Sequence, residues 1–141
     1  MIADMDIIYV THADKDMATD CYYIASTYVG DADGLLYSIV PHVNSLHQPF
    51  FIAQSRGFIR GFLRAKVDSI GTNIVIQDLY IDNRFRRMGL GTKLMNAQIN
   101  YAIANGARTL TLQARPLSVP FYEKMGFVRI HPQGHMLQKT L

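Results

Sequence analysis

The sequence predicts an α/β domain, in which a sheet is built from strands that precede and follow helices. Three observations favour this fold class. Short runs of apolar and β-branched residues are bounded by turn residues, as strands are. Longer stretches repeat their apolar residues at helical spacing. The length of 141 residues suits one domain with a substantial core, which we assign to residues 1–141.

Each predicted element rests on such a local pattern. In chain order we expect strand 6–11, helix 12–29, helix 34–40, strand 50–54, strand 58–68, strand 73–82, helix 91–106, strand 109–114, helix 118–125, strand 127–130 and strand 134–141.

The first two helices have recognisable ends. Met17 and Tyr28 lie on one side of the first helix, and Asp14 or a neighbour is expected to cap its start. Gly30 is expected to end it. In the second helix, Pro41 is expected to lie within or near the end, because proline interrupts helical hydrogen bonding.

The middle of the chain predicts a hairpin and a central strand. Ser55-Arg56-Gly57 supplies turn residues, and the strand that returns from this turn alternates cleanly between its two faces. The next strand, 73–82 (NIVIQDLYID), opens with a nearly continuous apolar run, which is typical of a strand covered on both faces. In the long helix that follows, Leu94, Ala97 and Tyr101 are expected to be buried.

The junction between the central strand and the long helix has the composition of an anion site. Arg86, Gly89 and Gly91 occur there in the spacing R-x-x-G-x-G, with Arg84 and Arg87 beside them. A helix N-terminus presents unpaired N–H groups and the positive end of the helix dipole. Glycine lets an anion approach the backbone closely. A phosphate or pyrophosphate is therefore expected to bind here, although an ordinary turn would also use such glycines.

Two other phosphate-binding motifs are excluded by the spacing. The segment does not read G-x-x-x-x-G-K-[ST], so it is not a nucleotide-triphosphate P-loop. It does not read G-x-G-x-x-G, and no chain-initial βαβ unit is present to hold a dinucleotide.

Two segments together resemble the GCN5-related N-acetyltransferase (GNAT) superfamily. Residues Leu79 to Leu94 are similar to its acyl-CoA-binding motif, roughly L-x-V-x-P-x-x-R-x-x-G-x-G-x-x-L. Residues Phe121 to Phe127 (FYEKMGF) are similar to its second signature. The segments occur in the family's order, separated by one helix and one strand, and the order of elements extends the resemblance over nearly the whole chain.

The resemblance implies the GNAT acyl-CoA N-acyltransferase fold and acetyl-CoA as co-substrate. That fold has a mixed, mostly antiparallel sheet of about six to seven strands flanked by about four helices. The pantetheine arm would lie along the central strand, and the pyrophosphate on the amides that follow. The residues expected to bind the cofactor are Leu79, Tyr80, Ile81, Arg86, Arg87, Met88, Gly89, Leu90, Gly91 and Thr92.

The resemblance also implies a general acid, Tyr122, which matches the tyrosine that protonates the departing thiolate in many family members. A phenol with a pKa of about 10 is protonated at neutral pH and can donate to a thiolate. The base is open. Asp78, on the central strand, is the nearest acidic candidate, but a structural partner for an arginine is an equal alternative. Glu123 is expected to be a solvated charge, and a chain of waters would need no dedicated base.

Three positions depart from the family pattern. Asn83 stands where proline is usual, Ser118 where alanine is usual, and Arg115 where the second signature has an asparagine that helps to hold the cofactor arm. We hypothesise that Arg115 instead reaches a phosphate of CoA.

Composition limits the function classes. The net charge of +3 and a pI near 9.1 favour an anionic cofactor but fall short of a nucleic-acid-binding signature. The single cysteine, Cys21, allows no internal disulfide and suits a reducing, cytoplasmic setting. We expect no membrane-spanning helix and no metal site. His42 and His47 precede the hairpin, where they would either border the acceptor pocket or be exposed loop histidines.

The expected function is transfer of an acetyl group to a primary amine of a small molecule or a protein. A non-catalytic CoA-binding module and a toxin-type GNAT protein acting on aminoacyl-tRNA are the alternatives. Homodimerisation is expected, because exposed strand edges can pair. Acidic residues in the first half would either attract a cationic amine or serve as surface charge and helix caps; they are Asp14, Asp16, Asp20, Asp31 and Asp33.

Overall fold

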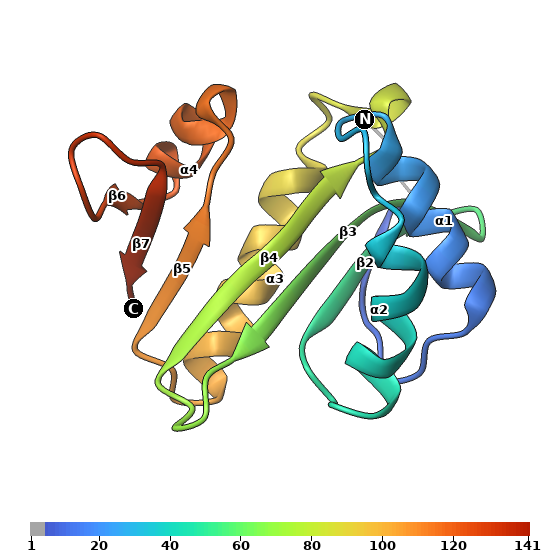
Figure 1. Cartoon of the computed structure of the whole chain (residues 1–141), viewed down its shortest axis with the longest axis horizontal. Helices are drawn as coiled ribbons and strands as arrows, with labels where there is room; N and C mark the ends of the chain where they lie inside the picture. The colour runs from blue at the N-terminus through green and yellow to red at the C-terminus, as the bar shows by residue number, and fades with distance from the viewer. Residues whose placement is uncertain (1–4) are drawn as a thin grey trace. The chain divides into compact units, whose positions relative to one another are not determined.

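The computed structural model describes residues 5–141, which form seven strands, four α-helices and two short 3₁₀ turns (Figure 1). The elements are β1 Asp6–Tyr9, α1 Lys15–Ser26, α2 Gly34–Asn44, β2 Phe50–Ser55, β3 Phe58–Val67, β4 Asn73–Ile81, η1 Asn83–Phe85, α3 Leu90–Ala104, β5 Thr109–Gln113, η2 Pro116–Ser118, α4 Val119–Lys124, β6 Val128–Arg129 and β7 Met136–Thr140.

The strands form one mixed sheet in the order β1-β2-β3-β4-β5-β7-β6. Neighbours pair antiparallel in β1–β2, β2–β3, β5–β7 and β6–β7, whereas β4 and β5 pair parallel. The predicted fold class is therefore confirmed. The central position of β4, predicted from its apolar start, is confirmed as well.

The chain divides into two compact units. Unit 1 comprises the described residues through Arg64 together with Asp78–Gln98, and unit 2 comprises Ala65–Gln77 and Ile99–Leu141. Three elements, β3, β4 and α3, contribute residues to both units. The single domain over residues 1–141 stays a prediction.

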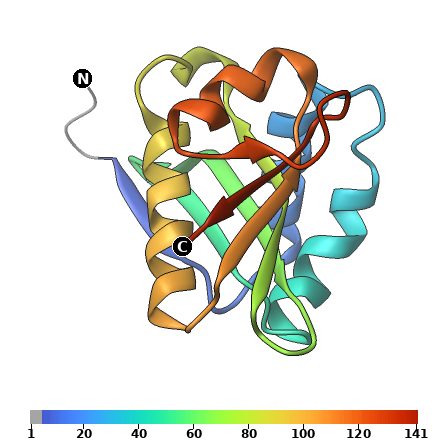
Figure 2. The ribbon, with the colours of Figure 1, turned by 90° about the vertical axis from the view of Figure 1, so that its left-hand side faces the viewer.

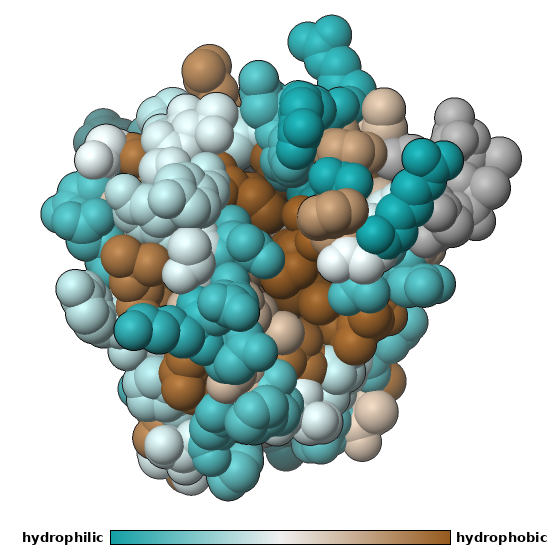
Figure 3. Space-filling view, turned by 90° about the vertical axis from the view of Figure 1, so that its right-hand side faces the viewer, coloured by the Kyte–Doolittle hydropathy of each residue, from teal (hydrophilic) through white to brown (hydrophobic). Residues whose placement is uncertain are grey.

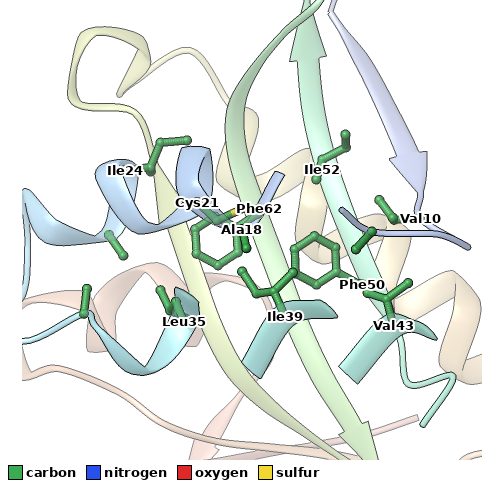
Figure 4. Close-up of a cluster of buried hydrophobic side chains, with 13 residues drawn as sticks. Val10, Ala18, Cys21, Ile24, Leu35, Ile39, Val43, Phe50, Ile52 and Phe62 are labelled. Carbon is green, nitrogen blue, oxygen red and sulfur yellow. The ribbon is translucent and has the colours of Figure 1, made fainter. Parts of the chain in front are cut away.

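The core of unit 1 lies between the helices α1 and α2 and the strands β2 and β3 (Figure 4). Cys21 of α1 and Ile39 of α2 are fully buried there with Phe50 and Phe62. The rings of Phe50 and Phe62 stack with centroids 5.9 Å apart. Each such large side chain contributes about 1.5–3 kcal/mol by leaving water, so this cluster fixes both helices on the sheet.

The opposite face of β2 and β3 in unit 1 is covered by the first part of α3 (Figures 1 and 2). Phe51 and Leu63 are buried although they alternate with the inward-facing Phe50 and Phe62. Strands buried on both faces are typical of the middle of a helix-covered sheet.

Helix α1 begins at Lys15 rather than at residue 12, because the carboxylate of Asp14 caps it by accepting from the N–H of Met17 at 2.9 Å. Helix α2 continues past Val40 to Asn44, so Pro41 lies inside the helix near its end, as predicted. The side chain of Asn44 bonds both the N–H and the carbonyl of Ala13, at 2.9 and 2.8 Å. This tertiary anchor holds the last turn of the helix in spite of the proline.

Unit 2 contains the C-terminal strands, α4 and the first part of β4. The side-chain oxygen of Asn73 on β4 accepts from the hydroxyls of Thr109 and Thr111 on β5, at 2.8 and 2.9 Å. Leu110 and Leu137 are fully buried on paired strands. The pairing of β5 with β4 covers Asn73–Ile76 and stops before Gln77.

Candidate active site

The loop between β4 and α3, in unit 1, is ordered by Asp82. Its carboxylate accepts from the backbone N–H of Arg84 at 3.0 Å and from two guanidinium nitrogens of the same residue, at 3.2 and 2.9 Å. Its carbonyl accepts from the N–H of Phe85 at 2.8 Å. These hydrogen bonds from Arg84 hold the pKa of the Asp82 carboxyl below its ordinary value. These hydrogen bonds therefore fix the geometry of the start of the loop, which leads into the proposed phosphate site.

Two residues of this loop have positive φ angles: Arg87 at 64° and Gly89 at 79°. A left-handed conformation is uncommon for a residue with a side chain and is often found at functional sites. Helix α3 starts at Leu90, one residue before the predicted start, and the carbonyl of Gly89 accepts from the N–H of Lys93 at 3.0 Å. The amides of the first helical turn point out of the helix end, where an anion would bind.

Arg86 is exposed at this loop, and its guanidinium lies 5.6 Å from the ring centroid of Tyr28, a residue of the segment after α1. This is the range of a cation–π contact. Sequence reasoning missed Tyr28, because nothing in its local pattern sets it apart among eight tyrosines.

A second aromatic contact braces the same loop. The guanidinium of Arg60 on β3 lies 4.4 Å from the ring centroid of Phe85 and 5.1 Å from that of Phe58. The N–H of Asp82 donates to the carbonyl of Arg60 at 2.7 Å. The Nε of Arg60 is buried and has no hydrogen-bond partner within residues 5–141. Arg60 thus supports the loop through its backbone and its charge.

The end of β4, where the pantetheine arm is expected, is half-buried over Leu79, Tyr80 and Ile81. The carbonyl of Ile81 accepts from the hydroxyl of Tyr28 at 2.6 Å. Gly61 of β3 lies so close that a Cβ there would stand 2.7 Å from Cδ1 of Ile81 and 3.0 Å from the carbonyl oxygen of Tyr80. Only glycine leaves this stretch of β4 undisturbed.

Asp78, the candidate base, forms an ion pair with Arg64 of β3. The distance from Arg64 Nε to Asp78 Oδ2 is 2.6 Å, and the side chains are only 18% and 14% exposed. Burial, with added repulsion from Asp20 and Asp78, raises the pKa of the nearby Cys21 thiol. The ion pair favours the structural alternative for Asp78, since one carboxylate oxygen already accepts a charge-assisted hydrogen bond.

Tyr122, the candidate acid, lies on α4 in unit 2 and is 8% exposed. Its carbonyl accepts from the N–H of Phe127 at 3.1 Å, and the carbonyl of Glu123 accepts from the N–H of Gly126 at 3.0 Å. The rings of Tyr122 and Phe127 meet edge to face at 5.8 Å. Together these features form a Schellman C-cap with its usual hydrophobic contact.

Gly126 has a φ of +93°, which the cap requires. A Cβ at this position would also stand 2.6 Å from the ammonium nitrogen of Lys139, which donates to the carbonyl of Met125 at 2.9 Å. The FYEKMGF segment is therefore a helix end with a structural requirement of its own, beside any role in chemistry.

The remaining candidates are His42, His47 and Arg115. His42 is not a loop histidine: it lies in α2, is 4% exposed, and its Nε2 is 3.0 Å from the carbonyl oxygen of Pro49. His47 is exposed, with a φ of 53°. Arg115 is exposed and precedes the 3₁₀ turn η2. Within residues 5–141, no cluster of three or more His, Cys, Asp or Glu side chains is arranged to hold a metal ion. In the same residues, no helix has the length and apolar character needed to cross a membrane.

The model of the acetyltransferase (GNAT) domain family matches residues 41–136, which is more than half of the chain. The chain belongs to the GNAT family. The resemblance drawn from the sequence is thereby confirmed, and with it acetyl-CoA as the co-substrate used by the family.

Known proteins are similar to this GNAT chain over different lengths. An uncharacterised N-acetyltransferase, ycf52, of Porphyra purpurea is 38% identical over 74 residues, which is 52% of this chain and 41% of ycf52. The matched region thus spans about two fifths of that relative. The solved structure of Ard1 from Thermoplasma volcanium superposes with a TM-score of 0.79 at 22% identity, covering 99% of both chains.

A further structure, the PaiA N-acetyltransferase of Thermoplasma acidophilum in complex with coenzyme A, superposes with a TM-score of 0.77 at 12% identity, covering 98% of this chain and 99% of that one. At such low identity these two superpositions establish the fold alone.

Proposed function

We propose that the protein is an N-acetyltransferase that binds acetyl-CoA at the β4–α3 loop and transfers the acetyl group to a primary amine in a ternary complex. The observation that carries the proposal is the ordered loop itself. An exposed arginine, Arg86, stands beside residues with positive φ angles and a helix N-terminus, in a chain of the GNAT family. The cofactor contacts proposed are those of Leu79–Ile81 and Arg86–Thr92.

In the proposed reaction, the amine nitrogen attacks the carbonyl carbon of the thioester and the C–S bond breaks. The departing thiolate takes the phenolic proton of Tyr122, and the amine releases its extra proton to Asp78 or to water. Because Asp78 is ion-paired with Arg64, we favour water as the first acceptor.

The acceptor amine is proposed to be a small molecule or a protein amine. A cytoplasmic location, the absence of a nucleic-acid partner and a homodimer stay predictions. Apolar side chains gather in the middle of the face seen in Figure 3, surrounded by hydrophilic ones. Such a patch is a reasonable place for a subunit contact, and sedimentation velocity measured over a range of protein concentrations would test the dimer.

The first experiment is a calorimetric titration with acetyl-CoA of the wild type, Arg86→Glu and the charge-matched control Arg108→Glu, which alters an exposed arginine of unit 2. We expect binding by the wild type and the control, and at least a tenfold loss in Arg86→Glu, since one attractive charge becomes repulsive. Absence of binding by the wild type would refute the proposal.

Turnover is tested by thiol release with a panel of primary amines. Tyr122→Phe keeps the ring that packs on Phe127, so we expect unchanged acetyl-CoA binding and a fall in kcat of about 100-fold. An unchanged kcat would remove Tyr122 as the acid. Binding without turnover on any amine, by the wild type, would favour the non-catalytic module instead.

A further inference from the structure

Tyr28 stands at the outer end of a run of contacting rings in unit 1. Phe50 stacks on Phe62 at 5.9 Å, Phe62 contacts Tyr80 at 5.7 Å, and Tyr80 stacks on Tyr28 at 5.8 Å between centroids. The N–H of Tyr28 donates to the carbonyl of Ala25 at 2.9 Å, which continues the last turn of α1. The ring of Tyr28 is thus held by the core on one side.

The hydroxyl of Tyr28 fixes the start of the loop. It donates to the carbonyl of Ile81 at 2.6 Å, across 53 residues of sequence. Ile81 is the last residue of β4 and directly precedes Asp82, whose side chain and carbonyl order the turn that follows. A displacement of the Ile81 carbonyl would therefore shift the whole loop.

The ring of Tyr28 also holds Arg86, whose guanidinium carbon lies 5.6 Å from the ring centroid. Arg84 differs from Arg86 in this respect, because two of its guanidinium nitrogens donate hydrogen bonds to the carboxylate of Asp82. A cation–π contact restricts the guanidinium without neutralising it and without occupying its N–H donors. An aromatic face is therefore a suitable support for an arginine that must bind a phosphate.

We infer that Tyr28 is a positioning residue for the pyrophosphate of acyl-CoA: its hydroxyl fixes the end of β4 and its ring holds Arg86 ready to bind. The inference rests on the proposed function. Tyr28 acts through Ile81 and Arg86 and takes no part in the acyl transfer.

The test compares Tyr28→Phe, Tyr28→Leu and the control Tyr23→Leu, an exposed tyrosine of α1. Calorimetry with CoA and with dephospho-CoA measures the affinity. We expect about threefold weaker binding in Tyr28→Phe, which loses one hydrogen bond. We expect about tenfold weaker binding in Tyr28→Leu, which also loses the cation–π contact. The control should bind as the wild type does. The loss should be equal for both ligands, because both carry the pyrophosphate.

Two further readouts separate positioning from general damage to the fold. The KM for acetyl-CoA should rise while kcat at saturation stays unchanged. In an Arg86→Ala background, Tyr28→Phe and Tyr28→Leu should bind CoA equally, because the ring has then lost the group that it holds.

The outcomes discriminate between the two proposals. If the wild type does not bind CoA, the proposed function fails. If the wild type binds and Tyr28→Leu, shown by its melting transition to be folded, binds equally well, the role of Tyr28 is overturned. Should Tyr28→Leu not fold, Tyr28→Phe carries the test alone, and unchanged affinity in that variant overturns the inference.

Discussion

Replacing Gln98 by methionine is expected to stabilise the protein. Gln98 lies on α3 and is fully buried, and neither atom of its amide group has a hydrogen-bond partner within residues 5–141. A buried polar group without a partner costs about 1–3 kcal/mol relative to the unfolded chain, where water satisfies it. Methionine is unbranched like glutamine, adapts to irregular space and has nearly the same helix propensity.

The size of the effect follows from removing that cost. The side chains one turn away on either side, Leu94 and Ala102, are fully buried, so the thioether would enter apolar surroundings. We expect the free energy of unfolding to rise by about 1–3 kcal/mol. For a chain of this length each kcal/mol moves the melting temperature by about 2–4 °C. The expected increase is therefore about 2–12 °C.

The assay is urea unfolding followed by far-UV circular dichroism, with calorimetry for the melting temperature. Asn96→Met alters an exposed residue of the same helix and should change stability by less than about 0.5 kcal/mol. Gln98→Glu, of nearly the same shape, should be strongly destabilising because it buries a charge. A lower unfolding midpoint in Gln98→Met than in the wild type would refute the reasoning, since the amide would then be contributing a bond.

Three further predictions concern single positions. Gly126→Ala should lower the free energy of unfolding by about 1–2 kcal/mol from the left-handed backbone alone, with an added cost from displacing Lys139. Equal melting temperatures for this variant and the wild type would contradict this. Cys21 should not react with Ellman's reagent in the native protein but should react fully in guanidinium chloride, because burial raises the pKa of its thiol; rapid native labelling would contradict it. Asp82→Ala should lower the free energy of unfolding by about 1 kcal/mol at pH 7 by removing a cap. Because the pKa of Asp82 is lowered in the folded state, the difference in stability between the wild type and this variant should disappear as the pH falls below the ordinary value of 3.8. A difference in stability that persists in acid would count against the cap.

Local chemistry explains what could be predicted from the sequence. The positive φ of Gly89 and the helix N-terminus after it follow from residues adjacent in the chain, so a glycine-containing turn before a helix could be predicted from the local sequence. The cap at Gly126 is local in the same way, because its hydrogen bonds close within the segment from Tyr122 to Phe127.

What could not be predicted depends on contacts between distant residues. Tyr28 meets Ile81 across 53 residues, and no periodicity in the sequence indicates such a pair. The last residue of α2 could not be predicted, because proline is a local signal, whereas the bonds between Asn44 and Ala13 that hold the last turn are tertiary. Gln98 did leave a signal, as it falls one turn after Leu94 on the apolar stripe of α3, but polarity argued against burial.

The close approach of Gly61 to β4 has a consequence for how variants of this protein would be interpreted. Alanine at that position would push on the Ile81 side chain and the Tyr80 carbonyl, and so on the strand proposed to hold the pantetheine arm. In a library sorted for failure to retain acetyl-CoA, codon 61 would then be enriched beside codons 86 and 89. A map of ligand contacts drawn from such enrichment would include a glycine that binds nothing and serves only by leaving space.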